Sequence, residues 1–341
     1  MITGLFDLQI RLERLDTNGD PLAKLDAMID WEQFRPELKA LRDKPRKSNA
    51  GARGYDPVMM FKAMILQSLY NISDEQLEYQ VLDRFSFSRF LGINIGGKVP
   101  DFTTFWLFRE ALAESGLERK LFDRFDAYLR DNGFAARKGQ IVDASIVQAP
   151  KQRNTRDENA KIKQGQSDEV RQAWSENKRR QKDTDARWTK KNGKTYFGYK
   201  NHVQTDVKHK FVRDYDVTAA NVHDGKVFED LLDGKNTSRD VWADSAYRSE
   251  ETLKTLDALG YREHLQRKGC RRRKLSEREK GGNHTRSKTR SRIEHIFGVQ
   301  AMKMGDTILR SIGILRARCK IGLRHLAYNL DRYTLLASPG G

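Results

Sequence analysis

The chain has 341 residues, of which 38% are hydrophobic and 33% are charged. Its formal net charge of +17 predicts a polyanionic partner, most simply DNA or RNA. A membrane surface fits less well, because the basic residues are spread over many segments and not gathered on one amphipathic helix. The two cysteines, Cys270 and Cys319, lack CxxC spacing, which argues against a disulfide framework and a structural zinc site. No signal peptide or bilayer-spanning run is expected, so we predict a cytoplasmic protein.

Residues 55–133 have the apolar spacing of a compact, all-helical region. Pro57 suits the first position of a helix, and Ser73 suits a helix cap. A short helix interrupted at Pro36 is expected before this region. Such a bundle either carries a helix-turn-helix, in which the helix near Thr103 reads DNA, or serves only as an arm or dimer contact. The helices expected here cover residues 57–71, 73–92, 101–116 and 117–133.

After residue 135 the pattern changes from helical to alternating. The segment 150–194 is rich in Lys, Arg, Gln and Asn and is expected to be partly helical or a loop. A second basic segment, 267–292, is predicted to be a loop. Strands are expected over 139–149, 195–206, 210–220, 240–245 and 261–266, and helices over 224–233, 249–260 and 306–336. This order predicts an α/β layout, with a mixed sheet and helices packed on it.

Three acidic residues stand in settings that suggest a metal site. Asp143 interrupts an apolar strand, Asp244 follows another, and Glu294 lies on a helix one turn after Arg290. Each has a structural alternative: Asp143 as an exposed acid at a strand end, Asp244 as a turn or N-cap residue, and Glu294 as half of a surface ion pair. Together the three carboxylates could hold divalent cations for phosphoryl transfer on a nucleic acid.

Three sequence blocks in this order resemble those of the DDE transposases of bacterial insertion sequences, most closely family five and the related family four. The blocks are IVDASIVQAP, VWADSAYRSEE and TRSRIEHIFG, the last with an Arg four positions before the Glu. YFGYKNHVQTD also resembles the hairpin strand of these proteins. Residues 55–114 resemble the domain that precedes their catalytic domain. The resemblance implies an α/β fold, an RNase H-like mixed sheet flanked by helices, after an all-helical N-terminal domain.

The same resemblance implies the domains and the chemistry. Residues 1–135 would form a helical domain for DNA binding or dimerisation, and residues 136–341 the catalytic domain with the basic insertion at about 150–194. The enzyme would bind the terminal inverted repeats, cleave at the element ends and join the 3′-hydroxyl to target DNA with two metal ions, Mg²⁺ or Mn²⁺. Asp143 would bridge the ions, with Asp244 holding one and Glu294 the other.

The family signature usually has a Tyr before the Arg and a Lys seven positions after the Glu. Here these positions hold Ser287 and Ala301, and Lys303 is the nearest lysine. We expect phosphate contacts from basic residues near the acids, namely Lys288, Arg290, Arg292, Lys303, Arg271, Arg272 and Arg273. The expected partners are double-stranded DNA, as transposon ends and target, and a second copy in a homodimer on DNA. The expected location is the nucleoid of a bacterial cytoplasm.

Two other classes fit the same acids. One is an RNase H-like nuclease or resolvase without strand transfer, and the other is a catalytically inactive DNA-binding derivative. An assay for joined products separates the first alternative from a transposase.

Overall fold

The computed structural model describes residues 7–42, 54–94, 96–191, 193–269, 273–305 and 308–338. The chain forms two compact units, Met1–Phe125 with Leu323–Gly341, and Asp126–Gly322. The sequence prediction assigned all of 136–341 to one domain. In the structure the last helix begins in the second unit and ends in the first, because the aromatic ring of Tyr333 packs on Phe125, at 6.1 Å between ring centroids.

The first unit is helical, as predicted for residues 55–133. Its core contains aromatic rings, among them Phe34 and Phe61, whose centroids are 5.0 Å apart. The elements are α1 (Asp7–Thr17), α2 (Pro21–Met28), η1 (Trp31–Phe34), α3 (Arg35–Lys39), η2 (Ala40–Arg42), α4 (Pro57–Tyr70), α5 (Asp74–Asp83), α6 (Phe85–Leu91), α7 (Phe102–Ser115), the start of α8 (Leu117–Asp131) and the end of α15 (Ile314–Leu336).

Two details of the predicted helices are wrong. The helix expected over 73–92 is divided at Arg84, whose backbone is extended, and this break lets Phe87 and Phe90 of α6 enter the core. Pro36 is the second residue of α3 and does not interrupt a helix, because a proline in the first turn leaves no intrahelical hydrogen bond unmade. The cap at Ser73 is confirmed, since its side chain accepts a hydrogen bond from the backbone of Gln76.

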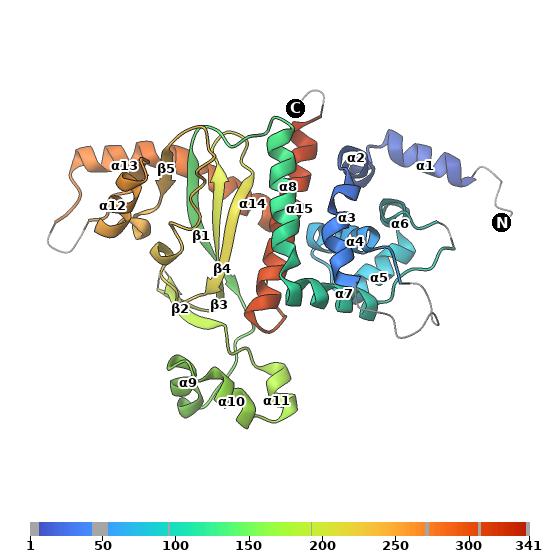
Figure 1. Ribbon diagram of the computed structural model, residues 1–341, viewed down its shortest axis with the longest axis horizontal. Helices are drawn as coiled ribbons and strands as arrows, with labels where there is room; N and C mark the ends of the chain where they lie inside the picture. The colour runs from blue at the N-terminus through green and yellow to red at the C-terminus, as the bar shows by residue number, and fades with distance from the viewer. Residues whose placement is uncertain are drawn as a thin grey trace. The chain divides into compact units, whose positions relative to one another are not determined.

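The second unit is built on a mixed sheet in the order β2-β3-β1-β5-β6, with β4 paired to β3 (Figure 1). Strand β1 runs antiparallel to β3 and parallel to β5, which is in turn parallel to β6. The predicted mixed sheet with flanking helices is therefore confirmed. Its elements are β1 (Gln140–Gln148), α9 (Arg156–Lys163), α10 (Ser167–Ala173), α11 (Glu176–Gln181), β2 (Arg187–Lys191), β3 (Lys194–Asp206), β4 (Val212–Ala219), η3 (Asp224–Lys226), β5 (Asp240–Ala243), η4 (Ser245–Tyr247), α12 (Glu250–Ala258), β6 (Arg262–Leu265), α13 (Glu277–Arg290) and α14 (Arg292–Lys303), with the end of α8 and the start of α15.

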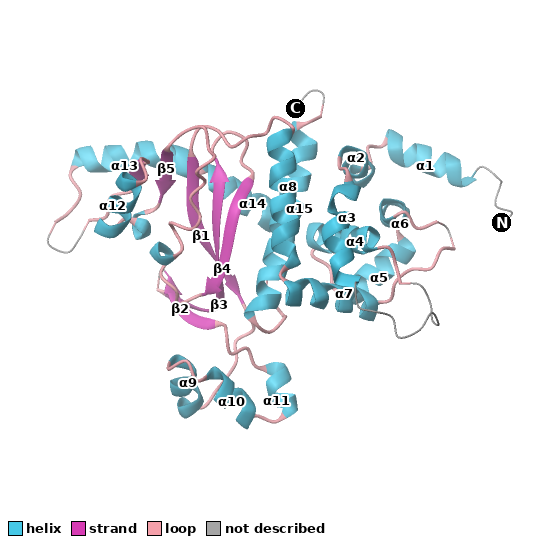
Figure 2. Cartoon of the chain, viewed as in Figure 1, coloured by secondary structure: helices cyan, strands magenta, loops and turns pink. Residues whose placement is uncertain are grey.

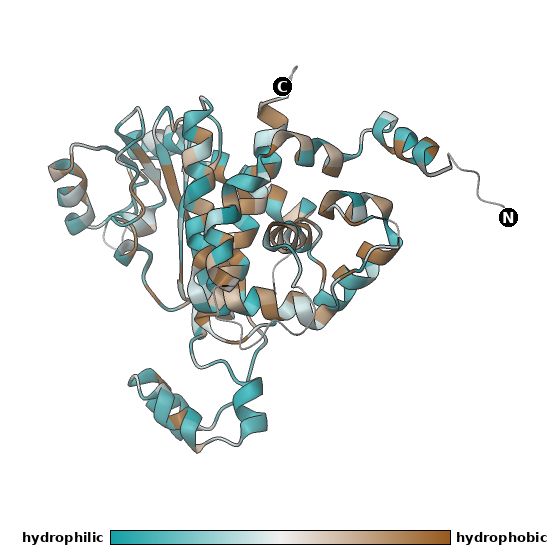
Figure 3. Cartoon of the chain, turned by 45° about the vertical axis from the view of Figure 1, so that its right-hand side comes forward, coloured by the Kyte–Doolittle hydropathy of each residue, from teal (hydrophilic) through white to brown (hydrophobic). Residues whose placement is uncertain are grey.

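The basic insertion consists of three short helices, α9 to α11, followed by β2 (Figure 2). These helices are mainly hydrophilic, with a few apolar residues between them (Figure 3). Ile162, Val170 and Trp174 form their small core. Trp174 is buried and donates a hydrogen bond to Glu158 over 2.7 Å.

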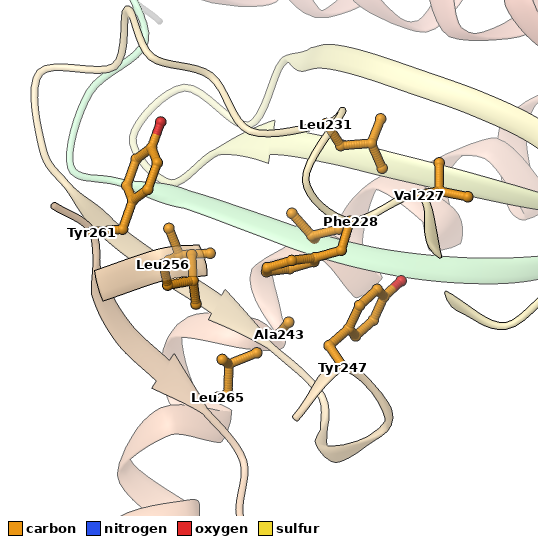
Figure 4. Packing of buried hydrophobic residues seen from close by; sticks show 10 residues of the cluster. Val227, Phe228, Leu231, Ala243, Tyr247, Leu256, Tyr261 and Leu265 are labelled. Carbon is orange, nitrogen blue, oxygen red and sulfur yellow. The ribbon is translucent and has the colours of Figure 1, made fainter. Parts of the chain in front are cut away.

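Two predicted segments differ from the structure. The helix expected over 224–233 is a short 3₁₀ turn, η3, followed by further turns. Its helix-like apolar spacing arises because Val227, Phe228 and Leu231 enter one core cluster beside the sheet (Figure 4). The predicted loop 267–292 contains α13, which begins with a capping box between Ser276 and Glu279.

In the part of the chain that the structure describes, none of the helices combines the length and the apolar character needed to cross a membrane.

Candidate active site

Asp143 lies in β1, one residue beyond the last pairing between β1 and β5. The parallel register pairs Val142 with Ala243, the last residue of β5, so Asp143 and Asp244 are the next residues along the two strands. The Asp143 side chain is 15% exposed. One oxygen accepts a hydrogen bond from the backbone of Ala144 over 2.8 Å, and the other contacts the guanidinium of Arg290. Asp143 is thus not an exposed acid at a strand end.

Asp244 follows β5 and caps the turn η4, where its side chain accepts a hydrogen bond from the backbone of Ala246. The structural alternative for Asp244, an N-cap residue, is therefore correct. Asp244 also lies beside Asp143, because β5 pairs with β1. Burial raises the pKa of Asp143, Arg290 opposes this shift, and the negative charge of Asp244 adds to it. The pairing of β1 with β5 places the two carboxylates near each other, in agreement with this repulsion.

Arg290 connects the third acid to the first. Its guanidinium lies 2.6 Å from Asp143 Oδ2 and 3.4 Å from Glu294 Oε1. Arg290 ends α13 and Glu294 lies in the first turn of α14, so the two residues occupy consecutive helices that meet at Ser291. Glu294 remains 62% exposed. The predicted Arg–Glu pair exists, and only the tertiary structure adds Asp143 to it.

The donor set suits a hard divalent cation. All three candidates are carboxylates, and two of them repel each other in a partly buried position, which a bound cation would relieve. Among the described residues, however, no three His, Cys, Asp or Glu side chains already form a metal-binding group. The guanidinium of Arg290 contacts both Asp143 and Glu294. The carboxylates would fit a cation once this guanidinium had turned away.

The predicted DNA-contacting residues have different surroundings. Lys288 and Lys303 are exposed on α13 and α14. Arg292 is exposed and donates to the carbonyl of Val207 over 3.0 Å, while Arg273 pairs with Glu279 over 2.8 Å and remains 77% exposed. Arg290 is engaged with the acids, as above, and Arg271 and Arg272 lie outside the described residues.

Sequence reasoning missed several residues around the acids. Lys191, at the end of β2, contributes positive charge that lowers the pKa of Asp143. Lys200 on β3 holds Asp224 over 2.7 Å. Tyr247 lies in the turn after Asp244, with a buried hydroxyl. The SAYRS block around Tyr247 was visible in the sequence, but it does not indicate a spatial neighbour.

Comparison with known proteins identifies the family. A family model described as "Transposase DDE domain" matches residues 134–330, more than half of the chain. The chain belongs to the DDE transposases. A second model, "Transposase domain (DUF772)", matches residues 10–111 of this transposase. A cryo-EM structure of the piggyBac transposase synaptic complex with hairpin DNA aligns with a TM-score of 0.46 and 11% identity, over 94% of this chain and 77% of that chain.

Membership confirms the predicted enzyme class, a polynucleotidyl transferase of the DDE type with an RNase H-like catalytic domain, and DDE transposases generally use divalent metal ions. The two departures from the family signature lie at α13 and α14. Ser287 accepts a hydrogen bond from Gln266 over 2.6 Å, and Ala301 is exposed. The family signature has a tyrosine at position 287. In this transposase the position holds a serine, which contacts Gln266, the residue that follows β6.

Proposed function

We propose that this transposase binds the terminal inverted repeats of an insertion sequence, cleaves DNA at the element ends and joins the 3′-hydroxyl to target DNA. The observation that supports this most is the placement of Asp143 on β1 and of Asp244 directly after the neighbouring strand β5, with Glu294 linked to Asp143 through Arg290. Such a cluster concentrates carboxylate charge where β5 ends beside β1, and a phosphodiester bound there would need cations for neutralisation.

In this proposal Asp143, Asp244 and Glu294 hold Mg²⁺, with Mn²⁺ as a substitute. The bound ions would activate water or the 3′-hydroxyl and neutralise the leaving oxygen in an in-line displacement. Arg290 keeps the acids charge-compensated while DNA is absent and then turns to a phosphate of the substrate. Its fork of N–H donors suits both a carboxylate and a phosphate.

Basic side chains near the acids would position the duplex without reading its sequence. Lys288 and Arg292 flank Arg290 in the chain, and Arg273 and Lys303 lie at the ends of this segment.

Sequence reading would come from residues 1–135 and from the basic insertion, residues 150–194. On α7 the exposed face carries Phe102, Trp106 and Leu107, which favours a protein contact there over phosphate binding. We propose a homodimer on DNA, because two ends must be held together.

The test is a joining assay with Mg²⁺ and a supercoiled plasmid that carries one element end. Asp143→Asn, Asp244→Asn and Glu294→Gln should each nearly abolish cleavage and joining, because neutral amides bind Mg²⁺ far less well. Glu250→Gln is the matched control: this acid is exposed on α12 and pairs with Lys254 at 85% side-chain exposure.

The outcomes separate the candidate functions. Joined products that depend on all three acids support the transposase proposal. Cleaved DNA without joined products would instead favour a nuclease or resolvase. Wild-type cleavage by Glu294→Gln would show that the third ligand has been assigned to the wrong residue.

A further inference from the structure

Tyr247 has a buried hydroxyl that the protein itself does not satisfy. The residue is 1% exposed, and its Oη has no hydrogen-bond partner within the residues that the structure describes. Leaving a buried hydroxyl unpaired costs free energy, because its hydrogen bonds to water are lost and not replaced. Phenylalanine would fill the same space without that cost. The hydroxyl therefore points to an acceptor that becomes available when the protein binds something.

The ring of Tyr247 is held in place by the core. It packs on Phe228 at 5.2 Å between centroids, in the cluster that includes Val142, Val227 and Ala243. Figure 4 shows the hydroxyl directed away from Leu265 and toward Val227. The phenol is thus aimed in one direction by its packing, and its freedom to turn elsewhere is small.

Tyr247 lies in the turn that Asp244 caps. Tyr247 is the third residue after Asp244, and its backbone N–H donates to the Asp244 carbonyl over 3.3 Å. The turn η4 that contains Tyr247 packs against η3, which begins at Asp224. Burial raises the pKa of Tyr247 well above its ordinary value, and the charges of Asp224, Asp143 and Asp244 raise it further. The raised pKa keeps the phenol protonated at neutral pH, where it can donate a hydrogen bond.

In the structure these carboxylates are engaged by other groups. Asp143 contacts Arg290, Asp244 caps its own turn, and Asp224 is held by Lys200 over 2.7 Å. We define Asp143 and Asp244 as the acid cluster. A cation held by this cluster and Glu294 that displaced Arg290 would reorient the two aspartates and expose their oxygen atoms to new donors.

We propose that Tyr247 is a positioning residue of the active site, whose phenolic O–H donates a hydrogen bond to a carboxylate oxygen of the acid cluster when a divalent cation is bound. This inference rests on the proposed function. Groups that hydrogen-bond to metal-ligating carboxylates fix their direction, and their loss typically costs about 10–100-fold in metal affinity or activity. The unsatisfied hydroxyl would then be a feature of the cation-free state only.

The experiment compares Tyr247→Phe with the full-length wild type. Mn²⁺ affinity is measured without DNA by titration calorimetry, and the Mg²⁺ dependence of end cleavage is measured in parallel. We expect Tyr247→Phe to bind Mn²⁺ about 10–100-fold more weakly and to need correspondingly more Mg²⁺. Its melting temperature should be unchanged or higher, because only an unpaired hydroxyl is removed. A merely structural tyrosine would show the opposite pattern, with lower stability and unchanged metal dependence.

Tyr261→Phe is the matched control. Tyr261 belongs to the same core cluster but lies beyond Leu256, away from Tyr247 (Figure 4), so its metal dependence should match the wild type. Asp143→Asn distinguishes a failure of the proposed role of Tyr247 from a failure of the proposed metal site. If Asp143→Asn loses Mn²⁺ binding while Tyr247→Phe retains it in full, the positioning role is overturned and the metal site stands. If both variants bind Mn²⁺ like the wild type, the proposed metal site fails and the role of Tyr247 fails with it.

Discussion

Replacing Arg290 with glutamine should destabilise the cation-free protein and strengthen its response to Mg²⁺. Arg290 lies 2.6 Å from Asp143 Oδ2, and the two side chains are 21% and 15% exposed. A pair with its charges about 4 Å apart at an effective dielectric constant of 20 gains about 4 kcal/mol. Breaking a buried pair costs about 3–5 kcal/mol. The partial exposure of both side chains reduces this, so we expect a loss of about 2–3 kcal/mol. The contact with Glu294 adds under about 1 kcal/mol, because that acid is 62% exposed.

Mg²⁺ should restore much of this loss in Arg290→Gln. A cation present at about 100 times its dissociation constant stabilises a protein by about 2.7 kcal/mol. In the wild type the cation must first displace the guanidinium, so the gain at the same concentration should be smaller. Urea unfolding with EDTA and with Mg²⁺, followed by circular dichroism, measures both quantities.

Lys288→Gln is the control for Arg290→Gln, because it removes the same charge from an exposed position of α13. It should change neither the stability nor the response to Mg²⁺ by more than about 0.5 kcal/mol. Equal stability of Arg290→Gln and the wild type in EDTA would refute the structural role of the pair. An equal Mg²⁺ response in the two proteins would refute competition between the guanidinium and the cation.

Three further predictions concern stability and binding. Asp143→Asn should be at least as stable as the wild type at pH 7, as measured by chemical unfolding. The pKa of Asp143 is raised in the folded state, so ionisation of this side chain lowers the stability of the wild type as pH rises. Burial, and to a smaller extent the charge of Arg324, lowers the pKa of His325 to about 3. Below pH 6.5 the unfolded chain binds a proton that the folded protein does not, so the free energy of unfolding should fall by up to about 1.4 kcal/mol per pH unit. His325→Gln should flatten this slope. Affinity for end DNA should survive EDTA but fall steeply with salt in a filter-binding assay, and a flat salt response would contradict a phosphate-dominated interface.

The sequence by itself determined most of the order of elements and led to the prediction of the three acids. Both follow from local signals: Asp143 interrupts a run of β-branched residues, and Asp244 follows a short strand of the same kind. Capping residues such as Ser73 and Ser249 begin helices through contacts within four residues, which the sequence displays directly. Where the local signal misled, as at 224–233, the apolar spacing of a helix came from residues that enter a core from irregular turns.

Only the tertiary structure decided how the acids are connected. The ion pair between Arg290 and Asp143 joins residues 147 positions apart, and no spacing rule reaches that far. Pairing of β1 with β5 brings Asp244 beside Asp143, and the core around Phe228 aims the hydroxyl of Tyr247. These contacts depend on strand register and side-chain packing, which are set by the whole fold. For that reason the residue types of the site were predictable, whereas the charge balance among them was not.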